Sequence, residues 1–185
     1  MLGIVEKGTN GLFGNEIEFN GKYATYVRFL KEEVGVVQTF RDAYVLGAII
    51  GFMNNKMETP DTTNKVQPAS IFPNELSKRK LDLKFIYRII MLLKEERTYS
   101  LDDYMNRAFR DDPEDNPETY ASNMLLFNSY VCGGVEYLYN MFQTYSSKDN
   151  EKVVDELYRY LHGVSIDVGL IEEDDLPDFT PDFGE

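Results

Sequence analysis

The chain has 185 residues and a formal net charge of −13, and 43% of its residues are hydrophobic and 14% aromatic. This apolar and aromatic content excludes a disordered chain and predicts one domain whose core needs neither a disulfide nor a metal. The net charge argues against a protein whose whole surface binds nucleic-acid phosphates.

The sequence predicts a cytoplasmic protein. Cys132 is the single cysteine, so no disulfide can form within the chain. The first residues lack the basic start and apolar run of a secretory signal. The longest apolar stretch, residues 44–53, is interrupted by Gly47 and Gly51 and is too short to cross a bilayer.

The N-terminal part begins with residues 1–15, which are rich in Gly and Asn and are expected to form a flexible segment. Residues 16–19 alternate polar and apolar side chains, as in a strand. Apolar residues then recur at helical spacing over residues 22–34, and Gly35 suits the left-handed position that ends a helix.

Two apolar helices are expected to form the centre of the core. Residues 40–53 are apolar on nearly every side, which is typical of a central buried helix. Gly47 and Gly51 lie on one face of this helix, where they favour close packing of another helix over the alternative of a functional groove. The second helix covers residues 81–93 and follows a long loop, residues 54–70, of a length that often marks a functional segment.

Helix-start signals mark the second half of the chain. Ser100 and Asp103 form a capping box that begins a short helix. After an acidic loop, Pro117 takes the first position of a long helix. Gly133 and Gly134, in the middle of that helix, are expected to kink it or to receive a close neighbour.

The last helix is expected over residues 149–162 and is expected to end at Gly163. Residues 164–171 are rich in β-branched side chains and are expected to pair with residues 16–19.

The predicted fold class is mainly α, a compact bundle of five to six helices with at most a small two-stranded β element and an acidic C-terminal tail. The expected organisation is a flexible N-terminus (1–15), a helical domain (16–163) and an acidic C-terminal segment (164–185). The central layer is expected to consist of three helices, 40–53, 81–93 and 120–142.

The sequence contains little that indicates catalysis. His162, the single histidine, lies beside the glycine expected to end a helix, where an imidazolium would suit the helix dipole. Cys132 lies in an apolar helical stripe and is expected to be buried and inert. The common nucleotide-binding, metal-binding and hydrolase motifs are missing. We therefore predict no catalytic residue, no metal and no cofactor, and a protein that is not an enzyme.

One basic cluster stands out in the acidic sequence and is a candidate nucleic-acid contact, with a plain solvated helix surface as the alternative. It consists of Lys78, Arg79, Lys80 and Lys84. Arg88 lies in an apolar stretch, and an arginine that is partly buried usually pairs with a carboxylate. Asp42, in the other apolar helix, is the expected structural partner of Arg88.

Arg107, Phe109 and Arg110 form a candidate anchor for a protein partner, because arginine and aromatic side chains dominate binding energies at interfaces. Local ion pairing of these arginines with Asp111 and Asp112 is the alternative.

The C-terminal tail is the third charged feature. Residues 167–185 carry eight carboxylates and no Lys or Arg, and without those eight charges the net charge of −13 falls to −5. Leu176, Phe179 and Phe183 are spaced among the acids and prolines, so the tail can dock in a groove of a partner or serve only to solvate the chain. It is similar to the acidic tails of bacterial single-stranded-DNA-binding proteins, except that it ends in Gly-Glu rather than on the aromatic residue.

A set of motifs over about residues 16–142 resembles a group of small bacterial proteins. The motifs are Phe19-x-Gly21-Lys22-x₃-Tyr26-x₂-Phe29-Leu30, Phe40-x-Asp42-x-Tyr44, Ile49-Ile50-Gly51-Phe52, Ile86-Tyr87-Arg88-Ile89-Ile90, Ala108-Phe109-Arg110 and Phe127-Asn128-Ser129-Tyr130-x₂-Gly133-Gly134-x-Glu136. These proteins are similar in turn to small accessory proteins encoded beside phage-defence and DNA phosphorothioation operons. The resemblance implies a context and no catalytic residues.

The leading hypothesis is a non-catalytic accessory subunit of a bacterial anti-phage defence complex that binds a larger partner of the nuclease or ATPase type. One alternative is an acidic DNA-mimic inhibitor. A second alternative is a nucleic-acid-binding helical protein, although we expect any DNA contact to be indirect or weak. The oligomeric state, the identity of the partner and the role of the 54–70 loop stay open at this point.

Overall fold

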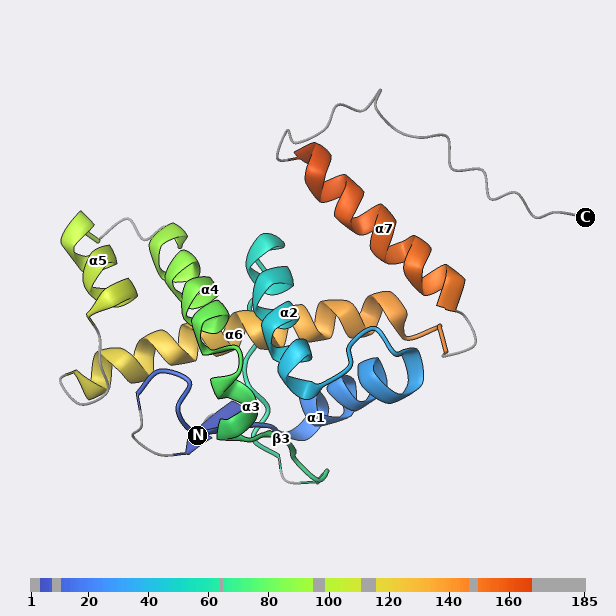
Figure 1. Ribbon diagram of the computed structural model, residues 1–185, viewed down its shortest axis with the longest axis horizontal. Helices are drawn as coiled ribbons and strands as arrows, with labels where there is room; N and C mark the ends of the chain where they lie inside the picture. Colours follow the sequence, from blue (N-terminus) through green and yellow to red (C-terminus); the bar gives the residue numbers. More distant parts are fainter. Residues whose placement is uncertain are drawn as a thin grey trace, which may run out of the picture.

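The computed structural model describes residues 4–7, 11–63, 65–94, 99–110, 116–146 and 150–167. One long helix, α6, runs across the molecule, and helices α2, α4 and α7 stand on one side of it (Figure 1). The helices are α1 (Gly21–Arg28), the π-helical segment η1 (Phe29–Val34), α2 (Phe40–Met53), α3 (Pro73–Ser77), α4 (Lys80–Leu93), α5 (Leu101–Phe109), α6 (Pro117–Phe142) and α7 (Asn150–Asp167).

The mainly α-helical fold predicted from the sequence is confirmed, with seven α-helices and η1 among the described residues where five to six helices were expected. The helices expected at 40–53 and 81–93 are α2 and α4, and the capping box at Ser100 begins α5. Gly35 ends η1 with a φ of 79°, the left-handed conformation expected of it.

The contact between α2 and α6 is the most extensive helix pair of the described residues, and it is made by glycines. A Cβ atom at Gly134 of α6 would collide with the backbone carbonyl of Gly47, and one at Gly51 would collide with the carbonyl of Tyr130. The two small faces therefore pack against each other at backbone distance, as the Gly47–Gly51 spacing predicts. We call this contact the glycine seam; α6 passes through it without a break.

Aromatic side chains fill the core next to the glycine seam. Tyr44 of α2 and Phe127 of α6 have ring centroids 5.7 Å apart, and Phe13 packs edge-on against both of them. The hydroxyl of Tyr44 donates a hydrogen bond of 2.7 Å to Oδ1 of Asn128, which is also buried. A polar pair inside this apolar cluster fixes how α2 and α6 are aligned along each other.

The small sheet has three antiparallel strands in the order β1 (Ile4–Lys7), β2 (Glu16–Phe19) and β3 (Ala69–Ile71). The strand expected at 16–19 is confirmed, but its partners are β1 and β3. Part of the N-terminal segment that was expected to be flexible is thus structured. Phe13 is only 1% exposed, because the core takes up its ring.

Helix α7 corrects two predictions. It continues through Gly163 to Asp167, so the expected helix end at Gly163 and the expected strand from residue 164 are both wrong up to residue 167. The apolar stripe of Val153, Leu157 and Tyr160 continues at Val164, four residues further on, and this helical spacing outweighs the local β propensity. The domain boundary expected at residue 163 therefore falls inside a helix.

The long loop expected after α2 is confirmed from residue 54 to residue 68, although β3 occupies its expected last residues. It is held to α1 and α6 by hydrogen bonds. Asp61 accepts one of 2.7 Å from the backbone amide of Lys22, and the Thr59 carbonyl accepts one of 3.1 Å from the hydroxyl of Tyr23. The loop thus lies on the side of α2 that carries the glycine seam.

Candidate interaction surfaces

An apolar groove lies between α2 and α4. Its upper part is a cavity of about 340 Å³ lined by Ile49, Phe52, Met53, Phe85, Ile86, Ile89 and Ile90. All seven side chains are apolar, and Phe85 is 64% exposed and Met53 47% exposed. Helix α2 is apolar on nearly every side, so the face that α6 does not cover becomes the wall of this groove.

The groove continues toward the start of α2. A second cavity, of about 200 Å³, shares Ile49 with the first and is lined further by Val45 and Leu46. Its far end carries Arg41, which pairs with Asp42 at 3.1 Å, and Arg79, which pairs with Asp82 at 3.0 Å. The two cavities together are called the α2–α4 groove below.

The structural pair expected between Asp42 and Arg88 is wrong. Asp42 accepts hydrogen bonds from the amide and hydroxyl of Thr39 at the start of α2 and pairs with Arg41. These bonds to Thr39 and Arg41 outweigh its desolvation by burial and lower the pKa of Asp42. Arg88 instead lies over the Phe109 ring, with its Cζ 5.0 Å from the ring centroid. The carboxylate of Asp42 is taken up by the local hydrogen bonds of the capping box and is therefore not paired with a residue of a neighbouring helix.

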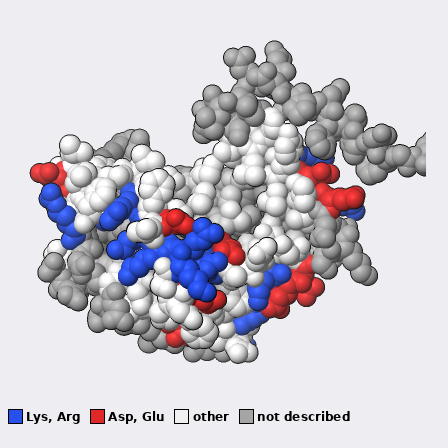
Figure 2. Space-filling model, in the orientation of Figure 1, with Lys and Arg blue, Asp and Glu red and all other residues white. Residues whose placement is uncertain are grey.

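The basic cluster lies at the start of α4. Lys and Arg side chains gather over α3 and the beginning of α4 in Figure 2, with a few carboxylates at the edges. Lys78 and Arg79 are exposed in the short link between the two helices, and Lys80 and Lys84 are partly exposed on α4. Residues 78–94 contain six Lys and Arg against a single Asp, and Arg79 of this basic cluster lines the far end of the α2–α4 groove.

The three residues expected to form a partner anchor do not act as one surface. Arg107 is only 8% exposed; its Nε donates to Oδ1 of Asn123 at 2.9 Å, and its guanidinium lies 4.7 Å from the Tyr99 ring centroid. Its position on the inner face of α5 makes it a structural arginine, which corrects the prediction. Phe109 is 49% exposed and Arg110 is exposed, so these two stay available for a partner.

Arg107 and Arg110 also border a polar cavity of about 480 Å³ between α5 and the start of α6. Most of its other lining side chains are uncharged hydrogen-bonding groups, including Asn106, Asn116 and Thr119. Nη1 of Arg107 is buried and has no hydrogen-bond partner among the described residues. The alternative prediction, ion pairing of these arginines with Asp111 and Asp112, falls outside the described residues.

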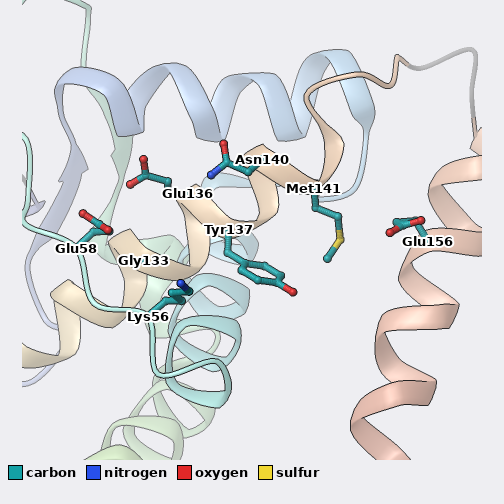
Figure 3. Close-up of a pocket in the computed structure, with 8 residues that line it drawn as sticks. All are labelled: Lys56, Glu58, Gly133, Glu136, Tyr137, Asn140, Met141 and Glu156. Carbon is teal, nitrogen blue, oxygen red and sulfur yellow. The ribbon is translucent and has the colours of Figure 1, made fainter.

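A cavity of about 500 Å³ lies between α6, the start of the long loop and α7. Tyr137 and Met141 project from α6 toward α7, which carries Glu156, while Glu58 and Glu136 lie at the other end (Figure 3). Glu136 is engaged by Lys22, whose Nζ lies 2.8 Å from its Oε2. Burial raises the pKa of Tyr137, which keeps its hydroxyl protonated.

The reactive side chains show no shared site. Cys132 is fully buried beside Gly133, as expected, and burial raises the pKa of its thiol. His162 lies inside α7 and not at a helix end as expected; its ring centroid is 5.2 Å from that of Tyr158. Over the described ranges, no three His, Cys, Asp or Glu side chains converge in a way that could hold a metal ion.

Leu176, Phe179 and Phe183, the tail residues expected to dock in a groove of a partner, lie outside the described residues, as does most of the acidic C-terminal segment. The α2–α4 groove is the surface that the sequence patterns did not identify. Phe85 and Ile89 recur at helical spacing with the core residues of α4, so periodicity alone places them in the core. The signal for a groove was present in α2, which carries more apolar surface than its contact with α6 covers.

None of the helices in the described part of the chain combines the length and apolar character needed to cross a membrane. Comparisons with protein-family models, with curated proteins and with solved structures find no match to this chain.

Proposed function

We propose that this chain is a non-catalytic interaction subunit that binds a larger protein through the α2–α4 groove. The observation that carries the proposal is the groove itself, an apolar channel with Phe85 and Met53 exposed at its upper end. A groove lined by apolar side chains of two helices, with exposed aromatic residues, suits an amphipathic helix or an extended segment of a partner.

The energetics favour this reading. Exposed apolar side chains gain roughly 25 cal/mol for each Å² that a partner removes from water. Phe85 supplies a large rigid ring at the groove mouth, the kind of side chain that dominates binding at interfaces. Phe109, on α5, contacts Arg88 of α4 and is 49% exposed, so it is a further apolar side chain available to a partner.

The basic cluster beside the groove indicates the charge of the partner segment. Because the basic cluster reaches the groove at Arg79, the segment should combine apolar anchors with acidic residues at that end. The resemblance to accessory proteins of phage-defence operons supports a nuclease or ATPase of such a system as the larger partner.

The test is co-expression of the tagged full chain with the proteins encoded beside its gene, followed by size-exclusion chromatography. We expect a stoichiometric complex that the substitution Phe85→Glu abolishes. Leu125→Glu is the matched control, because Leu125 is 46% exposed on α6 and does not line the groove. If no neighbour co-elutes, the proposal is rejected, and if Leu125→Glu is equally disruptive, the groove is not the binding surface.

The basic cluster favours a second candidate function, contact with nucleic acid. Lys and Arg side chains gather over α3 and the start of α4 in Figure 2, a clustering in space that the sequence alone did not establish. Changing Lys78, Arg79 and Lys80 together to Ala should then lower affinity for a DNA duplex and reduce the salt dependence of binding. Binding that is unaffected by the triple change would exclude this surface.

A further inference from the structure

The end of α2 contacts α7. Nδ2 of Asn54, one residue beyond α2, donates a hydrogen bond of 2.7 Å to the hydroxyl of Tyr160 on α7. Asp167, the last residue of α7, follows Tyr160 by seven residues, or about 10 Å of helix. The described chain therefore ends about two helical turns beyond a residue that contacts the end of α2, the end at which Met53 lines the α2–α4 groove.

The length of the remaining chain suits the groove. Nine residues lead from residue 168 to Leu176 and span at most about 30 Å when extended. The stretch from Leu176 to Phe183 covers about 24 Å when extended. Helix α4 has 14 residues and is about 21 Å long. The extended stretch from Leu176 to Phe183 would therefore match the length of this side of the groove.

The chemistry of the segment is complementary to the groove. Residues 172–185 contain seven carboxylates and no Lys or Arg, whereas the basic cluster reaches the far end of the groove at Arg79. Leu176, Phe179 and Phe183 supply apolar side chains for a groove lined by Ile49, Ile86 and Ile89. Covalent attachment also gives this segment an effective concentration that a free partner lacks.

We infer that residues 172–185 of this same chain dock in the α2–α4 groove and compete there with the partner. The regulatory part of this inference rests on the proposed function. A partner then has to displace the segment, and if the segment covers nine-tenths of the grooves, the apparent Kd of the partner rises about tenfold.

The test uses the full chain, labelled at the Ile methyl groups for NMR, and a triple variant with Leu176→Ser, Phe179→Ser and Phe183→Ser. We expect the methyl signals of Ile49, Ile86 and Ile89 to differ between the two proteins. Ile17 and Ile71, which are buried at the sheet, are internal controls and should not change. A synthetic peptide of residues 172–185, added to the triple variant, should restore the original signals.

Identical groove signals in the two proteins would overturn the inference. A difference that disappears on dilution would also overturn it, because the groove would then hold the tail of a second copy. A difference that is independent of concentration and weakens with added salt supports docking within one chain.

The two proposals fail separately. If Phe85→Glu abolishes partner binding while the tail substitutions leave the methyl signals of the groove unchanged, the inference fails and the proposed function stands. If the tail substitutions move the groove signals while Phe85→Glu leaves partner capture unchanged, docking stands and the proposed function fails. When both hold, the triple variant should bind the partner about tenfold more tightly than the original chain.

Discussion

One side of α2 packs against α6 at backbone distance, whereas its other side, which faces α4, leaves a groove open to solvent. On the α6 side, Gly47 and Gly51 leave no room for a Cβ atom. On the α4 side, Ile49, Phe52 and Met53 line an apolar cavity. A single helix of 14 residues thus carries both a contact at backbone distance and one wall of an apolar groove.

The difference separates residues that maintain the fold from residues that are free to bind. A contact at backbone distance cannot accommodate an added side-chain atom, because interiors are close-packed and neither backbone can move away. A contiguous exposed apolar patch contributes little to folding, and such patches mark interaction sites. Substitutions on the two sides of α2 should therefore have opposite effects on stability and on partner capture.

The largest effect is expected from Gly134→Ala in the glycine seam. The new Cβ would collide with the carbonyl of Gly47, so α2 and α6 would have to separate, at a cost of about 3 kcal/mol in the free energy of unfolding. Urea denaturation measures the loss. Cys132, the single cysteine, gives a second readout, because its buried thiol reacts with a labelling reagent only when this region opens.

Gly163→Ala is the matched control for the seam. Gly163 also lies inside a helix, but a Cβ atom there would meet no other atom within 4 Å. Alanine should therefore stabilise α7 by about 1 kcal/mol, since glycine is the weaker helix former. Equal destabilisation by both substitutions would show that backbone flexibility, and not the α2–α6 contact, explains the glycines.

The next effect is expected from Tyr44→Phe, which removes one hydroxyl from the core beside the seam. Asn128 is 1% exposed and would lose the hydrogen bond that its Oδ1 accepts from Tyr44. The loss should lower the free energy of unfolding by about 1–2 kcal/mol. A double variant that also carries Asn128→Leu should recover part of it, and no recovery would show that the pair contributes little.

The sequence predicts the seam side of α2 better than the groove side, for a physical reason. Gly47, Gly51 and the pair at 133–134 have the spacing of a small helix face, and only a close neighbour makes use of such a face. Phe85 has the same periodicity as the buried residues of α4, and periodicity cannot tell a core face from an open one. The pairing of β2 with β3 was missed because it joins segments about 50 residues apart.

A smaller effect, dependent on pH, is expected from Asp61 in the loop on the seam side. Hydrogen bonds from the backbone amides of Lys22 and Thr63 lower the pKa of Asp61. The carboxylate therefore stabilises the fold above its unfolded pKa of about 3.9, and this contribution is lost as the pH falls through the lower folded pKa.

The comparison of Asp61→Asn with the original chain isolates this contribution. Asparagine keeps one acceptor oxygen and removes the charge, so the original chain should be the more stable at pH 6, by less than about 1 kcal/mol, because the carboxylate is partly exposed and water screens it. The difference should disappear by about pH 2. Urea denaturation at several pH values measures it, and a difference that persists in acid would contradict the assignment.

The smallest effect on stability is expected on the groove side, from Phe85→Ala. Because the ring is 64% exposed, its removal should change the free energy of unfolding by less than about 0.5 kcal/mol. Leu83, two residues earlier on α4 and fully buried, provides the contrast, since Leu83→Ala should cost about 2–5 kcal/mol. If Phe85→Ala proves as destabilising as Leu83→Ala, the ring belongs to the core and the groove is closed in solution. If Phe85→Ala leaves stability unchanged while it weakens partner capture, then α2 and α4 hold this aromatic side chain at the surface for binding.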